Sequence, residues 1–131
     1  MIKLKVKSSK NKQIIDITSD IQKVITKRNI TEGVCMIFVK HTTASITTAN
    51  LDPGTDLDFL DAIENIIPKL KYRHPHNPKH AGDHIASSII GSSVNIPFRN
   101  GKMVLGIWQK VVLVELNGPK ERQIILNFVQ S

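Results

Sequence analysis

The sequence is poor in cysteine and in long apolar runs. It holds one cysteine, Cys35, so neither an internal disulfide nor a paired-cysteine metal site is available. Cys35 lies in the apolar run 34–39, and we expect it to be a small buried core residue. No stretch approaches the roughly 18 uninterrupted apolar residues that a membrane-spanning helix needs, and the lysine-rich residues 1–12 contain no apolar core of a secretion signal. We therefore expect a cytoplasmic protein that does not associate with a membrane.

Nucleotide-binding signatures are also missing. The sequence has no phosphate-binding loop and no dinucleotide fingerprint, and Ser45 lacks the Gly-x-Ser-x-Gly context of an α/β-hydrolase nucleophile. The length of 131 residues is that of one domain and excludes a two-domain cofactor enzyme. We expect a single domain over residues 1–131.

Negative charge is scarce relative to positive charge. Eighteen lysines and arginines against 11 aspartates and glutamates give a net charge of +7, which favours phosphorylated small molecules, nucleic acid or acidic surfaces as partners. The aromatic residues are four Phe, one Tyr and one Trp, and none alternates with basic residues as a base-stacking surface requires. Nucleic acid is therefore the weaker alternative.

Apolar periodicity predicts a β-rich α+β fold. Alternating or continuous apolar runs, two of them flanking the hairpin signal Asn100-Gly101, predict strands over residues 2–7, 13–17, 34–39, 94–98, 103–107, 110–116 and 124–129. A polar, β-branched stretch occupies residues 42–48. Because helices are too few for a repeated βαβ pattern, we expect a mainly antiparallel sheet or sandwich with three short helices.

The three helices are predicted from caps and apolar stripes. The first is capped within residues 18–20 and ends before Gly33, the second follows the turn 52–54 with Thr55 or Asp56 as N-cap, and the third is capped by Asp83. The inward-facing stripes are Ile21, Val24 and Ile25; Leu57, Leu60, Ile63 and Ile67; and Ile85, Ala86, Ile89 and Ile90.

Histidines form the strongest candidate site. A proline-containing segment without apolar periodicity, predicted as a loop over residues 69–83, holds or adjoins four of them, which are His74, His76, His80 and His84. The fifth, His41, follows the buried strand 34–39. Imidazole ligates metals, transfers protons near neutral pH and binds phosphate when protonated, whereas a histidine-rich loop can equally be solvated coil. We expect His41, His74 and His84 to converge on one ion or phosphate.

Other candidate residues allow two interpretations each. Asp83 can orient the His84 imidazole or simply cap the helix. Ser88 and Gly91 can offer polar groups to a phosphate, but small residues at a helix end are also common turn material. Trp108 lies between two predicted strands, so we expect it to be mostly buried, with Gln109 facing solvent.

Ordered blocks of the sequence resemble one known family. The blocks are His41–Thr48, Asp52–Gly54, Asp83–Gly91, Ile96-Pro97, Gly101 and Leu105–Gln109. Together they extend over nearly the whole chain and resemble the YjbQ-like family of small, largely uncharacterised proteins, often named secondary thiamine-phosphate synthases. The chain looks like an archaeal-type member.

The resemblance implies a β-rich α+β domain that assembles as a homotrimer with a polar site at the subunit boundary. The sequence departs from many members at Asn50 and Ile107, where they have Glu and Thr. With the resemblance, the candidate site residues are His41, Asp83 and His84 for catalysis; Ser45, Asn50, Asp52, Ser88, Gly91, Trp108 and Gln109 for substrate binding; and His41, His74 and His84 for a divalent metal, zinc or magnesium.

The reaction that the resemblance implies joins a hydroxymethylpyrimidine diphosphate to a thiazole phosphate, giving thiamine phosphate and pyrophosphate. Such a transfer needs stabilisation of a departing diphosphate and of a developing pyrimidine cation, to which cationic and metal groups are suited. Two alternatives remain open: a non-catalytic trimeric protein that binds a metal or anion through the same residues, and a basic nucleic-acid-binding protein.

Overall fold

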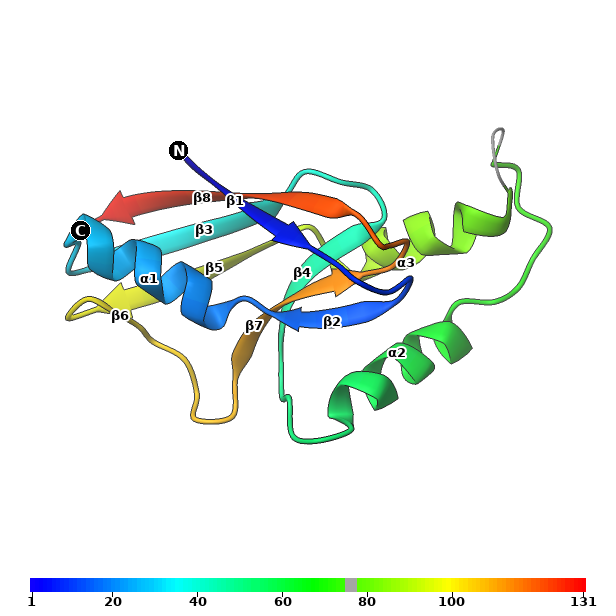
Figure 1. Cartoon of the computed structure of the whole chain (residues 1–131), viewed down its shortest axis with the longest axis horizontal. Helices are drawn as coiled ribbons and strands as arrows, with labels where there is room; N and C mark the ends of the chain where they lie inside the picture. Colours follow the sequence, from blue (N-terminus) through cyan, green and yellow to red (C-terminus); the bar gives the residue numbers. More distant parts are fainter. Residues whose placement is uncertain (75–77) are drawn as a thin grey trace.

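The computed structural model describes residues 1–74 and 78–131, and its strand pairings are antiparallel. One sheet has the strand order β1-β8-β3-β5-β6 and the other β2-β7-β4 (Figure 1). The strands are β1 (Ile2–Lys7), β2 (Gln13–Asp16), β3 (Gly33–Val39), β4 (Ala44–Ala49), β5 (Ser93–Arg99), β6 (Lys102–Met103), β7 (Lys110–Glu115) and β8 (Glu121–Gln130). The helices are α1 (Thr18–Arg28), α2 (Thr55–Ile66), α3 (Ala81–Ile90) and the short 3₁₀ helix η1 (Pro78–His80). The predicted fold class is confirmed.

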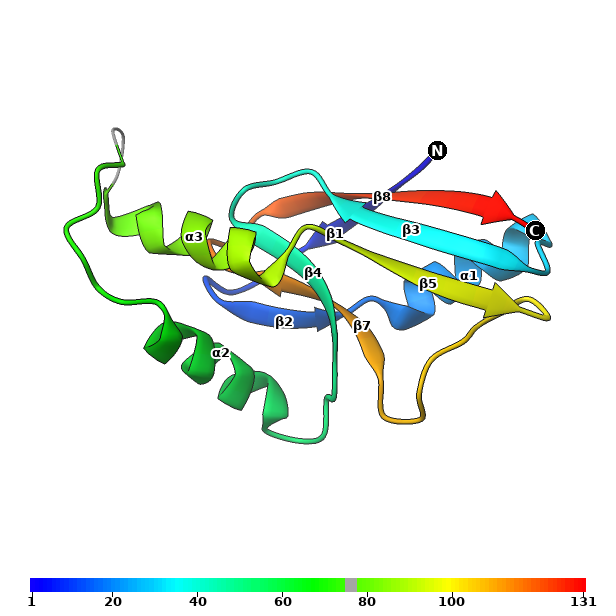
Figure 2. The same cartoon turned by 180° about the vertical axis from the view of Figure 1, so that it is seen from behind.

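The elements build three layers (Figures 1 and 2). The main core lies between the five-stranded sheet and one face of the three-stranded sheet, and α1 contributes Ile21 and Ile25 to it. A second apolar cluster lies on the other face of the three-stranded sheet, where α2 and α3 cover it. Because α2 and α3 cover this outer face, both faces of the three-stranded sheet are buried.

Strand β7 lies at the centre of this arrangement. Val111 and Leu113 belong to the main core, whereas Val112 and Val114 belong to the second cluster. Successive side chains of a strand point to opposite faces of its sheet, so β7 is buried on both sides. This burial explains its uninterrupted apolar run, and it leaves the next residue, Glu115, on the face between the two sheets.

The helix caps differ from those predicted. The N-cap of α1 is Ile17, and the Asp16 carboxylate accepts the Thr18 N–H at 2.9 Å. The N-cap of α2 is Gly54 at φ 88°, a left-handed conformation that suits glycine better than a polar side chain. The predicted caps within residues 18–20 and at Thr55 or Asp56 are therefore wrong, because the chain turns into each helix one residue earlier.

Helix α3 begins inside the predicted loop 69–83. Its N-cap is His80, so Asp83 lies in its first turn and does not cap it. Ala86 is buried and Ile90 packs against the second cluster, as predicted, but Ile85 and Ile89 are exposed. The stripe of α1 is confirmed, and in α2 the predicted residues pack inward except Leu57, which is exposed.

The segment after the Asn100-Gly101 turn is mostly loop. Both turn residues have positive φ, 53° and 74°, as the hairpin signal predicts. Strand β6 covers only Lys102–Met103, so the predicted strand 103–107 is wrong. Trp108 is 66% exposed, and the prediction that it is buried is also wrong. Across the described residues, no helix combines the length and apolar character needed to cross a membrane.

Candidate functional site: a buried ion pair beside histidines

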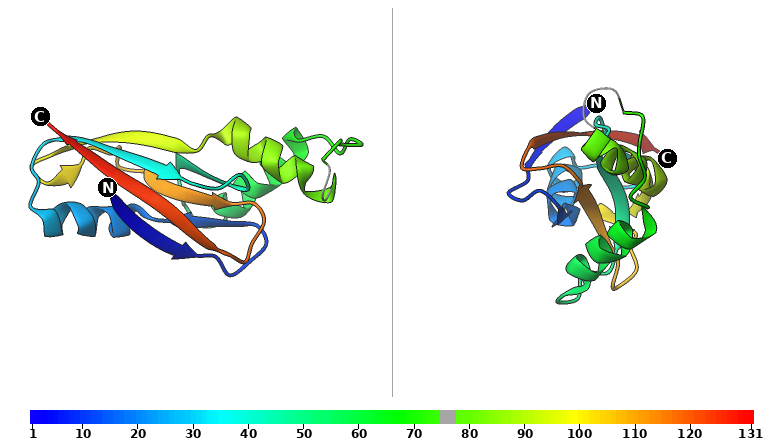
Figure 3. Two further views of the ribbon diagram at one scale, coloured as in Figure 1. Left: turned by 90° about the horizontal axis from the view of Figure 1, so that it is seen from above. Right: turned by 90° about the vertical axis from the view of Figure 1, so that its right-hand side faces the viewer.

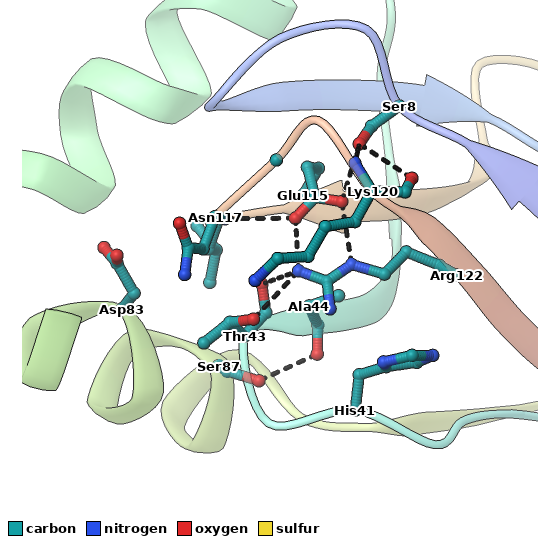
Figure 4. Close-up of polar contacts among 12 residues, drawn as sticks. Ser8, His41, Thr43, Ala44, Asp83, Ser87, Glu115, Asn117, Lys120 and Arg122 are labelled. Carbon is teal, nitrogen blue, oxygen red and sulfur yellow. Dashed lines mark hydrogen bonds and ion pairs between the residues drawn. The ribbon is translucent and has the colours of Figure 1, made fainter. Parts of the chain in front are cut away.

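A buried ion pair joins the end of β7 to the start of β8 (Figure 4). Arg122 Nε donates to Glu115 Oε2 at 2.8 Å and Arg122 Nη2 donates to Oε1, while the two side chains are 2% and 0% exposed. A two-point contact of this kind fixes both position and orientation of the guanidinium. The pair therefore sets the geometry at this end of the sandwich.

Neighbouring polar groups complete the ion pair. Ser8 Oγ donates to Glu115 Oε2 at 2.9 Å, the Asn117 N–H donates to Oε1 at 3.0 Å, and Arg122 Nη2 also donates to Thr43 Oγ1 at 2.8 Å. Burial alone would raise the pKa of Glu115, but the hydrogen bonds from Arg122, Asn117 and Ser8 outweigh it and leave that pKa below its usual value. Glu115 is therefore held as a carboxylate and is unsuited to proton transfer.

His41 lies beside this cluster, in the segment between β3 and β4 (Figure 4). Its Nε2 accepts the backbone N–H of Gln123 on β8 at 3.0 Å, which requires a neutral imidazole with its proton on Nδ1. Burial lowers the pKa of His41, and the positive charges of Arg122 and Lys120 lower it further against the opposing effect of Glu115. His41 is therefore neutral at pH 7.

His84 is paired with His74. The two rings are stacked, with centroids 4.9 Å apart and an interplanar angle of 24°. Burial lowers the pKa of His84, and so do the neighbouring His74, His80 and Lys120, whereas Asp83 acts in the opposite direction. The structure thus brings together two of the three histidines that were predicted to converge.

Asp83 interacts with residues other than His84. Its carboxylate accepts hydrogen bonds from the Lys12 ammonium and from His80 Nδ1, the latter at 3.1 Å. Lys12 also donates to the backbone carbonyl of Leu116. These contacts tie the start of α3 to the β1–β2 segment, and they engage the carboxylate for which the sequence left open a role in orienting His84 or in capping the helix.

The positive charge of Lys120 acts on both His41 and His84. It precedes β8, its backbone is bonded in both directions to Ser8, and its charge lowers the pKa of both His41 and His84. Figure 4 shows its side chain running past Arg122 toward Thr43. Within the described part of the chain, its ammonium makes no hydrogen bond or ion pair. We call His41, His74, His84 and Lys120 the histidine face.

The described residues do not form a metal centre. Among residues 1–74 and 78–131, no group of three His, Cys, Asp or Glu side chains is arranged to hold a metal ion, and His41 Nε2 is already engaged by Gln123. Zinc sites in proteins use three or four such ligands, and the described residues do not bring His41, His74 and His84 together as such a set, so the divalent metal stays a prediction. His76 lies outside the described residues.

Three predicted substrate-binding residues lie on α3 or β4 or between them, and two of these, Ser45 and Gly91, connect the helix to the strand. Ser45 is fully buried, and its Oγ donates to the Ser87 carbonyl at 2.8 Å, so it has no surface to offer a ligand. Ser88 donates to the carbonyl of His84 at 3.1 Å within the same helix. Gly91 ends α3 at φ 108° and accepts the Ile46 N–H at 3.1 Å. The contacts of Ser45 and Gly91 hold α3, which carries His84, against β4.

The remaining four predicted substrate-binding residues lie at the opposite end of β4; they are Asn50, Asp52, Trp108 and Gln109. Asn50 follows the strand, and its Oδ1 accepts the Asp52 N–H at 2.7 Å to form a turn. Gln109 donates to Thr48 Oγ1 at 3.1 Å, which places the Trp108–Gln109 pair at the same end. At roughly 3.3 Å per residue, the length of β4 separates this group from His41 by about 20 Å. Within one chain, the candidate residues therefore form two separate groups.

Sequence reasoning did not predict the roles of Glu115, Arg122 and Lys120. One signal was available, since Glu115 is a charged residue at the end of the apolar run 111–114, and a buried carboxylate requires a partner. Arg122 and Lys120 carried no such signal, because isolated basic residues near a turn are usually solvent-exposed.

The comparison with protein families decides the relationship of the chain. The model described as "UPF0047 protein YjbQ-like" matches residues 2–131. The chain belongs to the YjbQ-like UPF0047 family. It is 32% identical to UPF0047 protein MJ1081 of Methanocaldococcus jannaschii over 98% of this chain and 94% of that one, and 32% identical to UPF0047 protein YugU of Bacillus subtilis over 91% of each. Because archaeal and bacterial members are equally similar, the archaeal-type assignment stays a prediction.

Solved structures of the same family match the fold. A YbjQ-like protein of unknown function from Sulfolobus solfataricus superimposes with a TM-score of 0.92 at 31% identity, covering 99% of this chain and 96% of that one. A YjbQ/UPF0047 protein from Clostridium acetobutylicum gives 0.89 at 33% identity, covering 98% and 100%. The family resemblance deduced from the sequence blocks is confirmed.

Proposed function

We propose that this protein is a cytoplasmic, homotrimeric transferase that binds a phosphorylated small molecule at the histidine face. The observation that carries the proposal is Lys120, whose ammonium lacks a partner among the described residues and lies close enough to His41 and His84 to lower the pKa of both. The nearby carboxylates are engaged, Glu115 by Arg122 and Asp83 by Lys12 and His80. The charge that remains without a partner among the described residues is the Lys120 ammonium, and a positive charge favours an anion.

The reaction proposed from the family resemblance is the joining of a hydroxymethylpyrimidine diphosphate to a thiazole phosphate. The thiazole nitrogen forms the new C–N bond while the pyrimidine methylene C–O bond breaks and pyrophosphate leaves. Lys120 can neutralise charge on the departing diphosphate, and His41 or His84, once protonated, can add to it. We assign no step to a metal, because the side chains of one described chain do not form a site for it.

A binding protein without turnover is the second candidate. It is favoured because, among the described residues, the carboxylates beside the histidines, Asp83 and Glu115, are both engaged. A protein of this kind would bind the phosphorylated compound through the same lysine and histidines. Both candidates therefore predict the same binding residues and differ only in product formation.

The test is an assay for thiamine phosphate with the two phosphorylated substrates, run beside a binding measurement with inorganic pyrophosphate. We expect product from the wild type and at least a tenfold loss of both binding and product in Lys120→Ala and His84→Ala. Lys5→Ala, which removes an exposed positive charge on β1, is the matched control. Binding without product would select the second candidate, and wild-type binding in Lys120→Ala would refute both.

A further inference from the structure

The space between α2 and α3 is a cavity with an apolar floor. Its volume is about 720 Å³, which lies in the range of pockets that hold small molecules. Figures 1 and 3 show the two helices at the end of the molecule away from α1. The apolar side chains of the floor are those of Leu57, Leu60, Ile63, Ile67, Ala86 and Leu116. The cavity therefore offers a surface on which an apolar body, such as the face of a ring, can pack.

Helix α2 leaves its inner surface incompletely covered. None of its 12 residues is buried, although Leu60 and Ile63 pack against the second apolar cluster. Leu57, which also lines the cavity, is 58% exposed. Covering apolar side chains that still contact water is favourable, so a ligand in the cavity gains free energy from the surface that α2 leaves exposed.

Gly82 keeps the cavity open on the side of α3. It does not have a positive φ, and an added Cβ would lie 3.5 Å from Ile67 Cγ2 and 4.0 Å from Tyr72 Cε2, at ordinary van der Waals distances. The backbone therefore does not require glycine here, and alanine is the better helix former. Both neighbouring residues line the cavity, so a longer side chain at position 82 would occupy its space. The missing side chain leaves room in which a ligand can lie.

The charged residues that line the cavity are of both signs. They are Lys12, Lys69, Lys79, Asp61, Glu64 and Asp83. Lys12 and Asp83 form an ion pair with each other. Within residues 1–74 and 78–131, the carboxylates of Asp61 and Glu64 make no hydrogen bond or ion pair. The lining thus suits a ligand whose edge both donates and accepts hydrogen bonds, with the two carboxylates accepting from an amine.

A heteroaromatic ring that bears an amine combines these properties. Its two faces are apolar and pack on the floor, while its ring nitrogen accepts and its amine donates hydrogen bonds at the edge. A sugar carries hydroxyl groups around its ring, and burying them against Leu60 and Ile63 would leave them without partners. A hydrocarbon would in turn leave Asp61 and Glu64 without a donor. The cavity therefore favours the heteroaromatic amine over both.

The cavity reaches the histidine face at the start of α3. Asp83 lines the cavity, and the next residue, His84, belongs to the histidine face. On the opposite wall, Leu116 directly follows Glu115, the carboxylate of the buried ion pair. One elongated ligand can therefore place a ring in the cavity and a phosphate at the histidine face.

We propose that the α2–α3 cavity binds the amine-bearing heteroaromatic ring of the phosphorylated ligand. The faces of the ring lie on the apolar floor, and its amine donates to Asp61 and Glu64. The phosphate then reaches Lys120 and His84. The connection to the phosphate rests on the proposed function, whereas the ring site rests on the cavity itself.

Three probes separate the ring site from the anion site. Pyridoxamine, a pyridine with an aminomethyl group, tests the cavity alone, and inorganic phosphate tests the histidine face alone. Pyridoxamine 5′-phosphate joins the two. We expect calorimetry to show that pyridoxamine binds the wild type and that its 5′-phosphate binds at least tenfold more tightly than either part, because joined groups bind together. Absence of pyridoxamine binding would overturn the ring site.

The phosphate arm has its own outcomes. Lys120→Ala should remove the gain of pyridoxamine 5′-phosphate and leave the affinity for pyridoxamine unchanged. If inorganic phosphate does not bind the wild type, the proposed function fails, while pyridoxamine still decides the ring site. If inorganic phosphate binds but the 5′-phosphate binds no more tightly than pyridoxamine, the connection between cavity and histidine face is refuted. Ribose 5-phosphate should bind no better than inorganic phosphate, and tighter binding would contradict the class of ring.

Gly82→Leu tests the cavity by filling it. This variant should lose pyridoxamine binding and bind the 5′-phosphate like inorganic phosphate, with the affinity for inorganic phosphate unchanged. Gly82→Ala is the matched control, because it adds only the Cβ that the structure accommodates. It should retain the melting temperature of the wild type and weaken pyridoxamine binding less than Gly82→Leu does. A folded Gly82→Leu variant with the pyridoxamine affinity of the wild type would refute the ring site.

Removal of the carboxylates tests recognition of the amine without filling the cavity. Asp61→Asn combined with Glu64→Gln should weaken pyridoxamine binding at least tenfold. Asp58→Asn is the control, since Asp58 lies on the same helix but is not among the described residues that line the cavity. Equal losses in Asp58→Asn and in the double variant would show that affinity follows the total charge of α2, and would contradict recognition of the amine inside the cavity.

Discussion

At the scale of single residues, the buried pair of Glu115 and Arg122 is the most sensitive point of the structure. Arg122→Ala would leave Glu115 without its charged partner in a fully buried position. We expect this substitution to lower the free energy of unfolding by about 3–5 kcal/mol, because an uncompensated buried charge is costly. Urea denaturation of the wild type and the variant measures the difference.

Arg99→Ala is the matched control for this prediction. Arg99 pairs with Glu32 at 3.2 Å, but both side chains are more than half exposed. Exposed pairs contribute at most about 1 kcal/mol, so this variant should be close to the wild type. Equal losses for Arg99→Ala and Arg122→Ala would show that the buried pair has no special role.

The protonation of His41 and His84 predicts how stability depends on pH. Their pKa values are lowered in the folded protein, so the unfolded chain binds these protons first as the pH falls below about 6.5. The free energy of unfolding should therefore decrease from about pH 6.5 downward and level off once the folded pKa values have been passed.

His41→Gln isolates one part of this dependence. The Gln side chain offers an oxygen to the Gln123 N–H, as His41 Nε2 does, but it does not titrate. We expect a shallower decline of stability below pH 6.5 in this variant, measured by chemical denaturation at several pH values. An unchanged slope would show that His41 does not retain a neutral imidazole in the fold.

At the scale of elements, two serines determine where α3 lies. Ser87 Oγ donates to the Ala44 carbonyl at 2.7 Å, and Ser45 Oγ donates back to the Ser87 carbonyl. Ser87→Ala should cost about 1–3 kcal/mol because it leaves the buried carbonyl without its donor. Ser88→Ala, one residue along the same helix and exposed, should cost little; thermal unfolding of the two variants compares them, and equal costs would argue against this attachment.

Strand positions were largely predictable from the sequence, and the exceptions share a cause. The runs 2–7, 34–39 and 110–116 alternate or stay apolar because their burial lies within the chain, and each is a strand. The segment 103–107 is equally apolar, but after Met103 it forms a loop in which Val104 and Ile107 are exposed. An apolar pattern indicates that residues avoid water, without showing whether the covering surface belongs to the same chain.

Helix starts were less predictable for a related reason. Asp83 has the sequence features of an N-cap, yet Lys12 lies 71 residues away in the chain and engages its carboxylate. A contact of such separation leaves no local signal. The start of α3 at Ala81 therefore depends on how the whole fold places the β1–β2 segment beside it.

At the scale of the whole molecule, the candidate site was only half predictable. The types of residue were identified, because histidines in a proline-containing segment and after a buried strand are distinctive. Their convergence was not, since His74 and His84 stack while His41 bonds to β8. The partition of the other candidates between the two ends of β4 is likewise a consequence of topology, which composition does not specify.

The central claim, an anion site at the histidine face, is tested most directly by calorimetric titration of pyrophosphate between pH 5.5 and 8. Because His41 and His84 are neutral at pH 7 and bind a phosphate better when protonated, we predict that affinity rises as the pH falls below about 6.5. Lys120→Ala should lose at least tenfold at every pH, and Lys5→Ala should match the wild type. Affinity that is independent of pH and of Lys120 would contradict the account.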